Sequence, residues 1–94
     1  MKISEVSIEL VKPKDGLIGF ASMVVDDGLY IGSIGIMKRI NSEGYRLVYP
    51  NKKVADKAFN YFYPINTMTG SFIESEVMKK LTLVMKTNES IFPY

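Results

Sequence analysis

The sequence predicts an α+β fold, in which an antiparallel sheet of four to five strands is covered on one face by a carboxy-terminal helix. Four apolar segments between residues 3 and 49 are separated by short runs rich in Gly, Asp and Asn, as in an antiparallel meander. From about Thr69 the apolar residues recur at every third or fourth position, which is the period of an amphipathic helix. The chain has 94 residues, enough for one domain, and we place it at residues 1–86 with a short tail at residues 87–94.

The first four strands follow from alternation and from turn residues. The segment from residue 3 to residue 11 alternates apolar and polar side chains, as a strand with one buried face should. The segment from residue 17 to residue 25 is apolar on both faces, which indicates a central strand covered on both sides. Asp and Gly at residues 26–28 tolerate the positive φ of a tight hairpin turn. We therefore expect antiparallel strands at Ile3–Val11, Leu17–Val25, Leu29–Ile40 and Tyr45–Tyr49.

The segment after Pro50 is expected to be a basic loop followed by a fifth, aromatic strand. Residues 51–58, NKKVADKA, need no regular structure, and the strand at Phe59–Tyr63 ends at a proline, which cannot donate to the ladder. A strand between a meander and its covering helix buries at least one face, so we expect most of its aromatic rings in the core or in a subunit interface. Stacking of bases on Tyr61 or Tyr63 is the alternative, and it requires exposed rings beside the basic loop.

The carboxy-terminal helix is expected to cover the sheet with one apolar stripe. Ser71 and Glu74 are three residues apart and match a capping box at the start of the helix. A stripe at three- and four-residue spacing is typical of a face packed on a core. The stripe consists of Ile73, Val77, Leu81 and Val84.

Positive charge is concentrated in one part of the chain. The whole chain has a net charge of only +2, but residues 36–58 carry six basic residues against two acidic ones, a local net charge of +4. Such a segment attracts phosphate or an acidic partner if the chain brings its cations together, and otherwise it is an ordinary solvated loop. The candidate binding residues are Lys38, Arg39, Arg46, Lys52, Lys53 and Lys57.

Composition excludes several classes of site. The chain has no cysteine and no histidine, so it forms no disulfide and lacks the commonest metal ligands and the commonest general base. The glycines of GLYIGSIG, residues 28–35, are not followed by the Lys-Ser/Thr of a phosphate-binding loop, and we assign them to a strand. No apolar run is long enough to span a membrane, and the amino terminus does not have the pattern of a signal peptide. We therefore expect a cytoplasmic protein with no enzymatic activity, no cofactor and no small-molecule substrate.

Two motifs, in this order after four strands, resemble one known family. They are YPNKK at residues 49–53 and YPINTMTGSFIESEV at residues 63–77. Over roughly residues 3–82 the chain resembles the stage V sporulation protein G (SpoVG) family. The resemblance implies a small α+β protein, usually a homodimer, that binds DNA or RNA and acts as a regulator in sporulation or septation.

The chain departs from the pattern of that family at three places. Tyr63 stands where the family has His, residues 33–35 replace an Asp-Ile-Arg-like stretch, and Gly70 and Phe72 replace basic residues at the helix start. Lys52 and Lys53 keep the basic character of the loop. The departures at the helix weaken the expectation of phosphate contacts there, although the free amides of a helix amino terminus can still bind an anion.

The expected function is therefore nucleic-acid binding with a regulatory outcome. We expect Lys52, Lys53 and Lys57 to contact phosphates, supported by Arg46, Lys38 and Arg39 if the strands bring them close. The alternative is a protein-interaction module whose basic loop binds an acidic partner. A homodimer is expected in either case, because a single helix cannot cover both apolar faces of the sheet.

Overall fold

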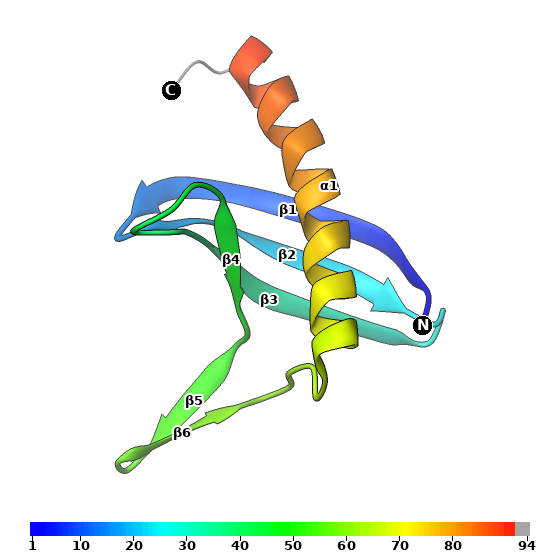
Figure 1. Ribbon diagram of the computed structural model, residues 1–94, viewed down its shortest axis with the longest axis vertical. Coiled ribbons are helices and arrows are strands. Elements are labelled where there is room, and N and C mark those ends of the chain that lie inside the picture. Colours follow the sequence, from blue (N-terminus) through cyan, green and yellow to red (C-terminus); the bar gives the residue numbers. More distant parts are fainter. Residues whose placement is uncertain (92–94) are drawn as a thin grey trace.

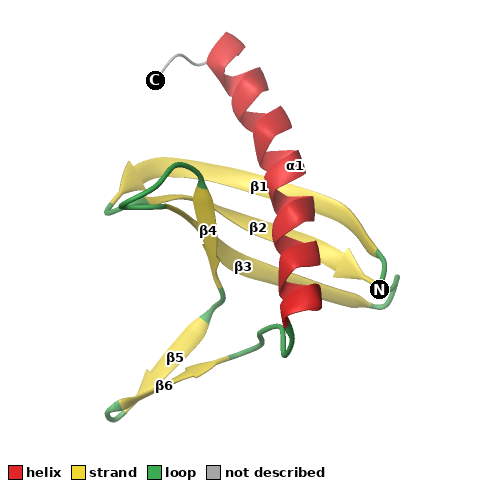
Figure 2. Ribbon diagram, in the orientation of Figure 1, coloured by secondary structure: helices red, strands yellow, loops and turns green. Residues whose placement is uncertain are grey.

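The computed structural model describes the backbone of residues 1–91 and the side chains of residues 1–86. Within residues 1–91, six strands precede one long helix, and the strands form two separate antiparallel sheets (Figures 1 and 2). The larger sheet has four strands in sequence order, and the smaller one is a hairpin of two strands. The elements are β1 (Ile3–Lys14), β2 (Leu17–Val25), β3 (Leu29–Lys38), β4 (Tyr45–Val48), β5 (Asn51–Val54), β6 (Lys57–Asn60) and α1 (Thr67–Ile91).

Tight turns join the first three strands, as the sequence predicts. Asp26 and Asp27 both have positive φ, and the amide of Gly28 donates to the carbonyl of Val25 at 3.0 Å. Asp15 and Gly16 form the turn between β1 and β2, also with positive φ at both residues. Aspartate and glycine tolerate this conformation, so a two-residue turn joins β1 to β2 and a three-residue turn joins β2 to β3. The first strand is longer than the expected Ile3–Val11, because residues 12–14 also belong to β1.

The helix covers one face of the four-stranded sheet, and the core lies between them (Figure 1). Three residues of the predicted helical stripe are buried, and Val77 has no exposed surface. They pack against side chains from the two central strands of the sheet. The buried core consists of Ala21, Met23, Ile34, Ile36, Ile73, Val77 and Leu81. The predicted α+β fold, with an antiparallel sheet and a carboxy-terminal helix packed on it, is confirmed.

The segment between β4 and α1 differs from the prediction. Residues 51–58 are not an irregular loop, because Asn51–Val54 and Lys57–Asn60 pair as a hairpin. The predicted strand Phe59–Tyr63 is also wrong, since β6 ends at Asn60 and joins β5 rather than the main sheet. The turn contains no glycine, and Ala55 adopts the positive φ instead, at 57°. Every residue from 51 to 60 is exposed, so no apolar alternation marks these strands.

Of the two places expected for these aromatic rings, the core and a subunit interface, the core is wrong for three of the four rings in the described chain, and the interface stays a prediction. Phe59, Tyr61 and Tyr63 are exposed by 54%, 67% and 59%. Phe62 alone of the four packs partly against the core. Because the hairpin projects from the sheet and does not lie beneath the helix, its strands have no buried face (Figure 1).

The helix starts earlier than the predicted capping box. The side-chain oxygen of Asn66 accepts a hydrogen bond from the amide of Thr69 at 2.8 Å, which makes Asn66 the amino-terminal cap. Ser71 and Glu74 therefore lie inside α1, and the predicted cap at Ser71 is five residues too late. Of the predicted tail at residues 87–94, the backbone of residues 87–91 continues α1, and residues 92–94 lie outside the described part of the chain.

Candidate nucleic-acid interface

The hairpin of β5 and β6 brings together three of the predicted site residues. Lys52 lies directly across from Phe59, Lys53 from Ala58, and Lys57 from Val54. Side chains opposite each other share one face, and successive side chains alternate between faces. Lys52 and Lys57 therefore lie on the same face of the hairpin, and Lys53 lies on the other.

Two exposed aromatic residues continue the face that carries Lys52 and Lys57. Phe59 belongs to this face because it pairs with Lys52. The amide of Tyr61 donates to the carbonyl of Pro50 at 2.9 Å, which extends the ladder by one pair beyond Asn60. Tyr61 is two residues after Phe59, so it points to the same side. We call this surface the lysine–aromatic face; its members are Lys52, Lys57, Phe59 and Tyr61.

The base of the hairpin is attached to the body of the protein by an aromatic pair. The rings of Tyr49, just before β5, and Phe62, just after β6, meet edge to face with centroids 5.8 Å apart. Both rings pack against the core. Burial raises the pKa of the Tyr49 phenol, and the Glu74 carboxylate on α1 raises it further. The pair joins the two ends of the hairpin to the core, while its strands remain exposed.

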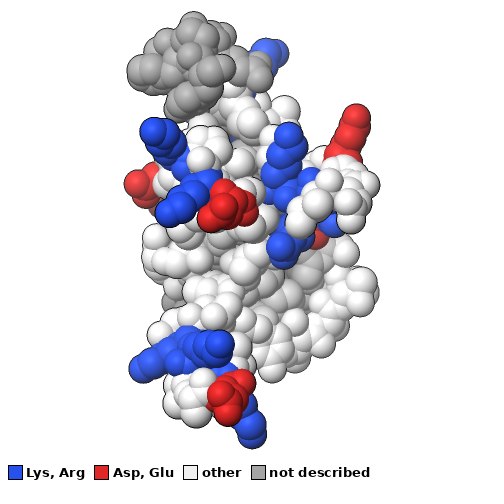
Figure 3. Space-filling model, turned by 90° about the vertical axis from the view of Figure 1, so that its left-hand side faces the viewer, with Lys and Arg blue, Asp and Glu red and all other residues white. Residues whose placement is uncertain are grey.

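The other three predicted site residues lie in a different region. Lys38 ends β3 and pairs across the strands with Tyr45, and Arg46 follows on β4. The guanidinium of Arg39 lies 3.7 Å from the Glu74 carboxylate, and both side chains are partly exposed. Figure 3 shows the cations on this side of the molecule as separate groups, one at the lower end where the hairpin projects and others higher, with uncharged surface between them. The local charge of +4 is therefore divided between two regions.

Two lysines near this second region were not among the predicted residues. Lys12 and Lys14 are exposed at the end of β1, and Lys14 pairs with Leu17, which in turn pairs with Met37. The amide of Lys38 donates to the carbonyl of Gly16 at 2.8 Å, so the β1–β2 turn lies beside the end of β3. The antiparallel meander brings these lysines close to Lys38, although they are distant in sequence. The predicted antiparallel order of the first three strands was the signal that could have placed Lys12 and Lys14 beside Lys38.

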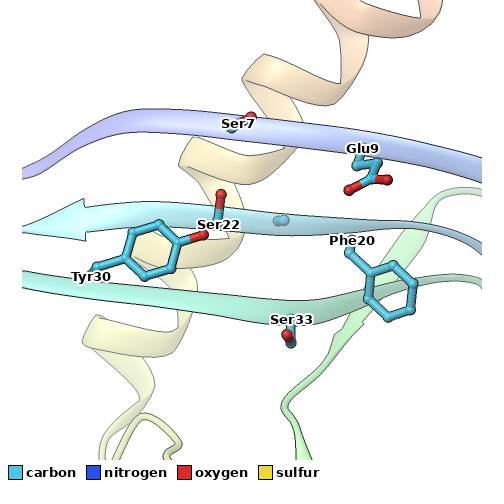
Figure 4. A pocket seen from close by; sticks show the side chains of 7 residues that line it. Ser7, Glu9, Phe20, Ser22, Tyr30 and Ser33 are labelled. Carbon is cyan, nitrogen blue, oxygen red and sulfur yellow. The ribbon is translucent and has the colours of Figure 1, made fainter.

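A hollow of about 420 Å³ lies on the sheet face opposite α1 (Figure 4). Phe20 and Tyr30 contribute aromatic rings to it, and Glu9 contributes a carboxylate. The remaining polar side chains are those of Ser7, Ser22 and Ser33. Its lining includes no basic residue, and the Glu9 carboxylate repels phosphate. This hollow is therefore a poor site for a nucleic-acid backbone.

Within the described residues, no three carboxylates gather closely enough to hold a metal ion.

In the same part of the chain, no helix is long and apolar enough to cross a membrane.

The fold and the hairpin together define a class of protein: a small α+β domain whose four-stranded meander is covered by one helix, with a basic hairpin inserted between sheet and helix. The family model of SpoVG matches residues 1–82, most of the chain. The chain belongs to the SpoVG family, and this membership makes it a protein related to sporulation and septation. Searches of curated proteins and of solved structures give no significant match.

Proposed function

We propose that this protein is a cytoplasmic nucleic-acid-binding regulator that contacts phosphates through the β5–β6 hairpin. The observation that carries the proposal is the placement of Lys52, Lys53 and Lys57 on a projecting hairpin whose only acidic residue is Asp56. Phosphate contacts of this kind supply affinity and orientation without reading base sequence. The protein acts by binding, and its regulatory effect follows from where it binds.

The hairpin is suited to reach a polyanion. All of its residues are exposed, and β5 and β6 pack mainly against each other. A two-stranded ribbon of this kind can enter or follow a groove without disturbing the core behind it. Its three lysine side chains spread over both faces, so they can contact phosphates on either side of the ribbon.

The test is a double substitution, Lys52→Ala with Lys53→Ala, compared with Lys12→Ala with Lys14→Ala. Both variants lose two positive charges from exposed positions, and both should keep their stability within about 0.5 kcal/mol. Fluorescence anisotropy against duplex DNA, single-stranded DNA and RNA is measured over a range of salt concentrations. The hairpin variant should bind more weakly, and on duplex DNA its slope of log affinity against log salt should become shallower by about one unit per lost phosphate contact.

The Lys12→Ala, Lys14→Ala control shows whether affinity for nucleic acid depends on the position of the lysines or only on the net charge of the protein. If the β1 variant loses as much affinity as the hairpin variant, binding depends on total charge and the hairpin is not the interface. If the hairpin variant keeps both its affinity and its salt slope, the proposal is wrong.

A second candidate function is binding of an acidic protein through the same hairpin. The exposed apolar side chains of Val54, Phe59, Ile65 and Met68 favour it, because protein interfaces combine apolar area with charge. Heparin and a defined nucleic acid, compared at equal salt, separate the two functions. A nucleic-acid binder shows a gap in affinity between them, whereas a surface that binds acidic groups in general does not.

A further inference from the structure

We propose that the preferred ligand of the hairpin is a single strand, whose unpaired bases stack on Phe59 and Tyr61. This inference rests on the proposed function and concerns the same site. It starts from the lysine–aromatic face, where two cations and two aromatic rings lie on one side of a two-stranded ribbon. Single-strand binders combine these two features, because lysines follow the backbone and aromatic rings accept the faces of bases.

The spacing of the two rings fits successive bases. Phe59 lies on β6, and Tyr61 is two residues later, directly after the end of the strand, where its amide still bonds to Pro50; at strand spacing their Cα atoms are ~6.6 Å apart. This distance is about twice the ~3.4 Å rise between stacked bases, which leaves room for a base on each ring. In a duplex the base faces are covered by their neighbours, and the two rings would have no partner.

The lysines lie where the backbone of such a strand would pass. Lys52 is directly across the ladder from Phe59, and Lys57 precedes Phe59 by two residues on the same strand. Both cations therefore flank the aromatic row on one face. Lys53, on the opposite face, is directed away from this row.

Exposure of the rings supports a role in binding. Phe59 has no polar atom that could hydrogen-bond to water, yet 54% of it is exposed, and Tyr61 is exposed by 67%. Exposed aromatic rings that share one face of a ribbon with cations mark an interaction surface. The three lysines of the hairpin favour a polyanion over an uncharged partner as the occupant.

The experiment uses the full chain and three single substitutions, Phe59→Ala, Tyr61→Ala and Phe59→Leu. Anisotropy is measured with a labelled single-stranded oligonucleotide and with its duplex at equal salt. We expect wild-type protein to prefer the single strand, and each alanine variant to lose affinity for it by roughly 5- to 150-fold. Duplex affinity and the salt slope should stay unchanged, because no phosphate contact is removed.

Phe59→Leu distinguishes stacking from general apolar contact. Leucine keeps much of the apolar area but has no aromatic face, so this variant should lose affinity for the single strand as the alanine variant does. The matched control is Tyr63→Ala, which removes a tyrosine of similar exposure, 59%, outside the hairpin ladder. It should keep wild-type affinity.

Several outcomes would overturn the inference while leaving the proposed function intact. They are tighter binding of the duplex by wild-type protein, full retention of affinity by Phe59→Leu, or equal losses in Tyr63→Ala and Tyr61→Ala. Conversion of a dimer to a monomer by Phe59→Ala, detected by light scattering, would assign the rings to a subunit interface and would overturn it too. A different result would show that the proposed function itself is wrong: the Lys52→Ala, Lys53→Ala variant would then bind every nucleic acid as tightly as wild type does.

Discussion

At the scale of single residues, Asn66 determines where α1 begins. Its side-chain oxygen satisfies the amide of Thr69, one of the four amides at a helix start that have no partner within the helix. Asn66→Ala removes this acceptor and should lower the free energy of unfolding by about 1 kcal/mol. Asn66→Asp retains an acceptor and should stay close to wild type. Thermal or urea unfolding measures both, and an equal loss in the two variants would show that the side chain does not act as a cap.

Tyr49 should make stability depend on pH in the alkaline range. Its pKa is raised above the ordinary value of 10.0, first by burial and then by the Glu74 carboxylate. At a pH below this ordinary value, the Tyr49 phenol is protonated in both the folded and the unfolded protein, so the stability that the buried neutral phenol contributes is fully present. As the pH rises through the raised pKa of the folded state, this contribution is lost, because the unfolded chain has already released its proton.

The measurement compares wild type with Tyr49→Phe, which keeps the ring packed edge to face on Phe62. Urea unfolding from about pH 9 to about pH 11 should show that wild type loses stability faster than the variant. Because the two proteins differ only at this phenol, the comparison isolates the contribution of Tyr49. A difference in stability that stays constant across this interval would contradict the expectation.

At the scale of elements, α1 holds the fold together through one buried stripe. Val77 has no exposed surface and lies against the sheet, so Val77→Asp places a carboxylate among apolar side chains that offer it no partner. We expect the variant to lose more than ~3 kcal/mol of stability or to fail to fold. Ser75→Asp is the control, because it adds the same group at an exposed position two residues away. Circular dichroism melts should show a large decrease for Val77→Asp alone, and a small decrease would place the stripe on the wrong face.

The elements also show which parts of the structure the sequence could predict. The meander and the helix were predictable because each buries one face, and burial leaves a period of two or of 3.6 residues in the sequence. The β5–β6 hairpin buries neither face, so alternation between Lys52, Lys53 and Val54 carries no apolar signal. Its turn at Ala55 lacks the glycine or asparagine that usually marks a hairpin. The hairpin was therefore not predictable from either kind of signal.

At the scale of the whole molecule, the part of the candidate site that depends on residues close in sequence was predicted, and the part that depends on the strand order was not. Local charge identified Lys52, Lys53 and Lys57, which lie close together because they are close in sequence. It did not show that the cations around Lys38 form a separate region, because that arrangement depends on the strand order of the sheet. The aromatic residues were identified as important but assigned to the core or to a subunit interface, since only the direction of the hairpin reveals that Phe59 and Tyr61 are exposed on this chain.

One face of the four-stranded sheet is free to form a subunit interface. The helix covers one face of the four-stranded sheet, and the opposite face exposes Phe20 and Tyr30 by 38% and 70% around the hollow that Glu9 lines. We propose that a second copy of the chain covers this face, so light scattering at tens of micromolar protein should give twice the mass of the chain. Phe20→Lys tests the surface, because Glu9 lies directly across from residue 20 and can pair with the new cation in the monomer. The variant should therefore fold but become monomeric, since association would bury the added charge. A wild-type protein that has the mass of a single chain under these conditions, or a Phe20→Lys variant that remains dimeric, would rule out this face as the subunit interface.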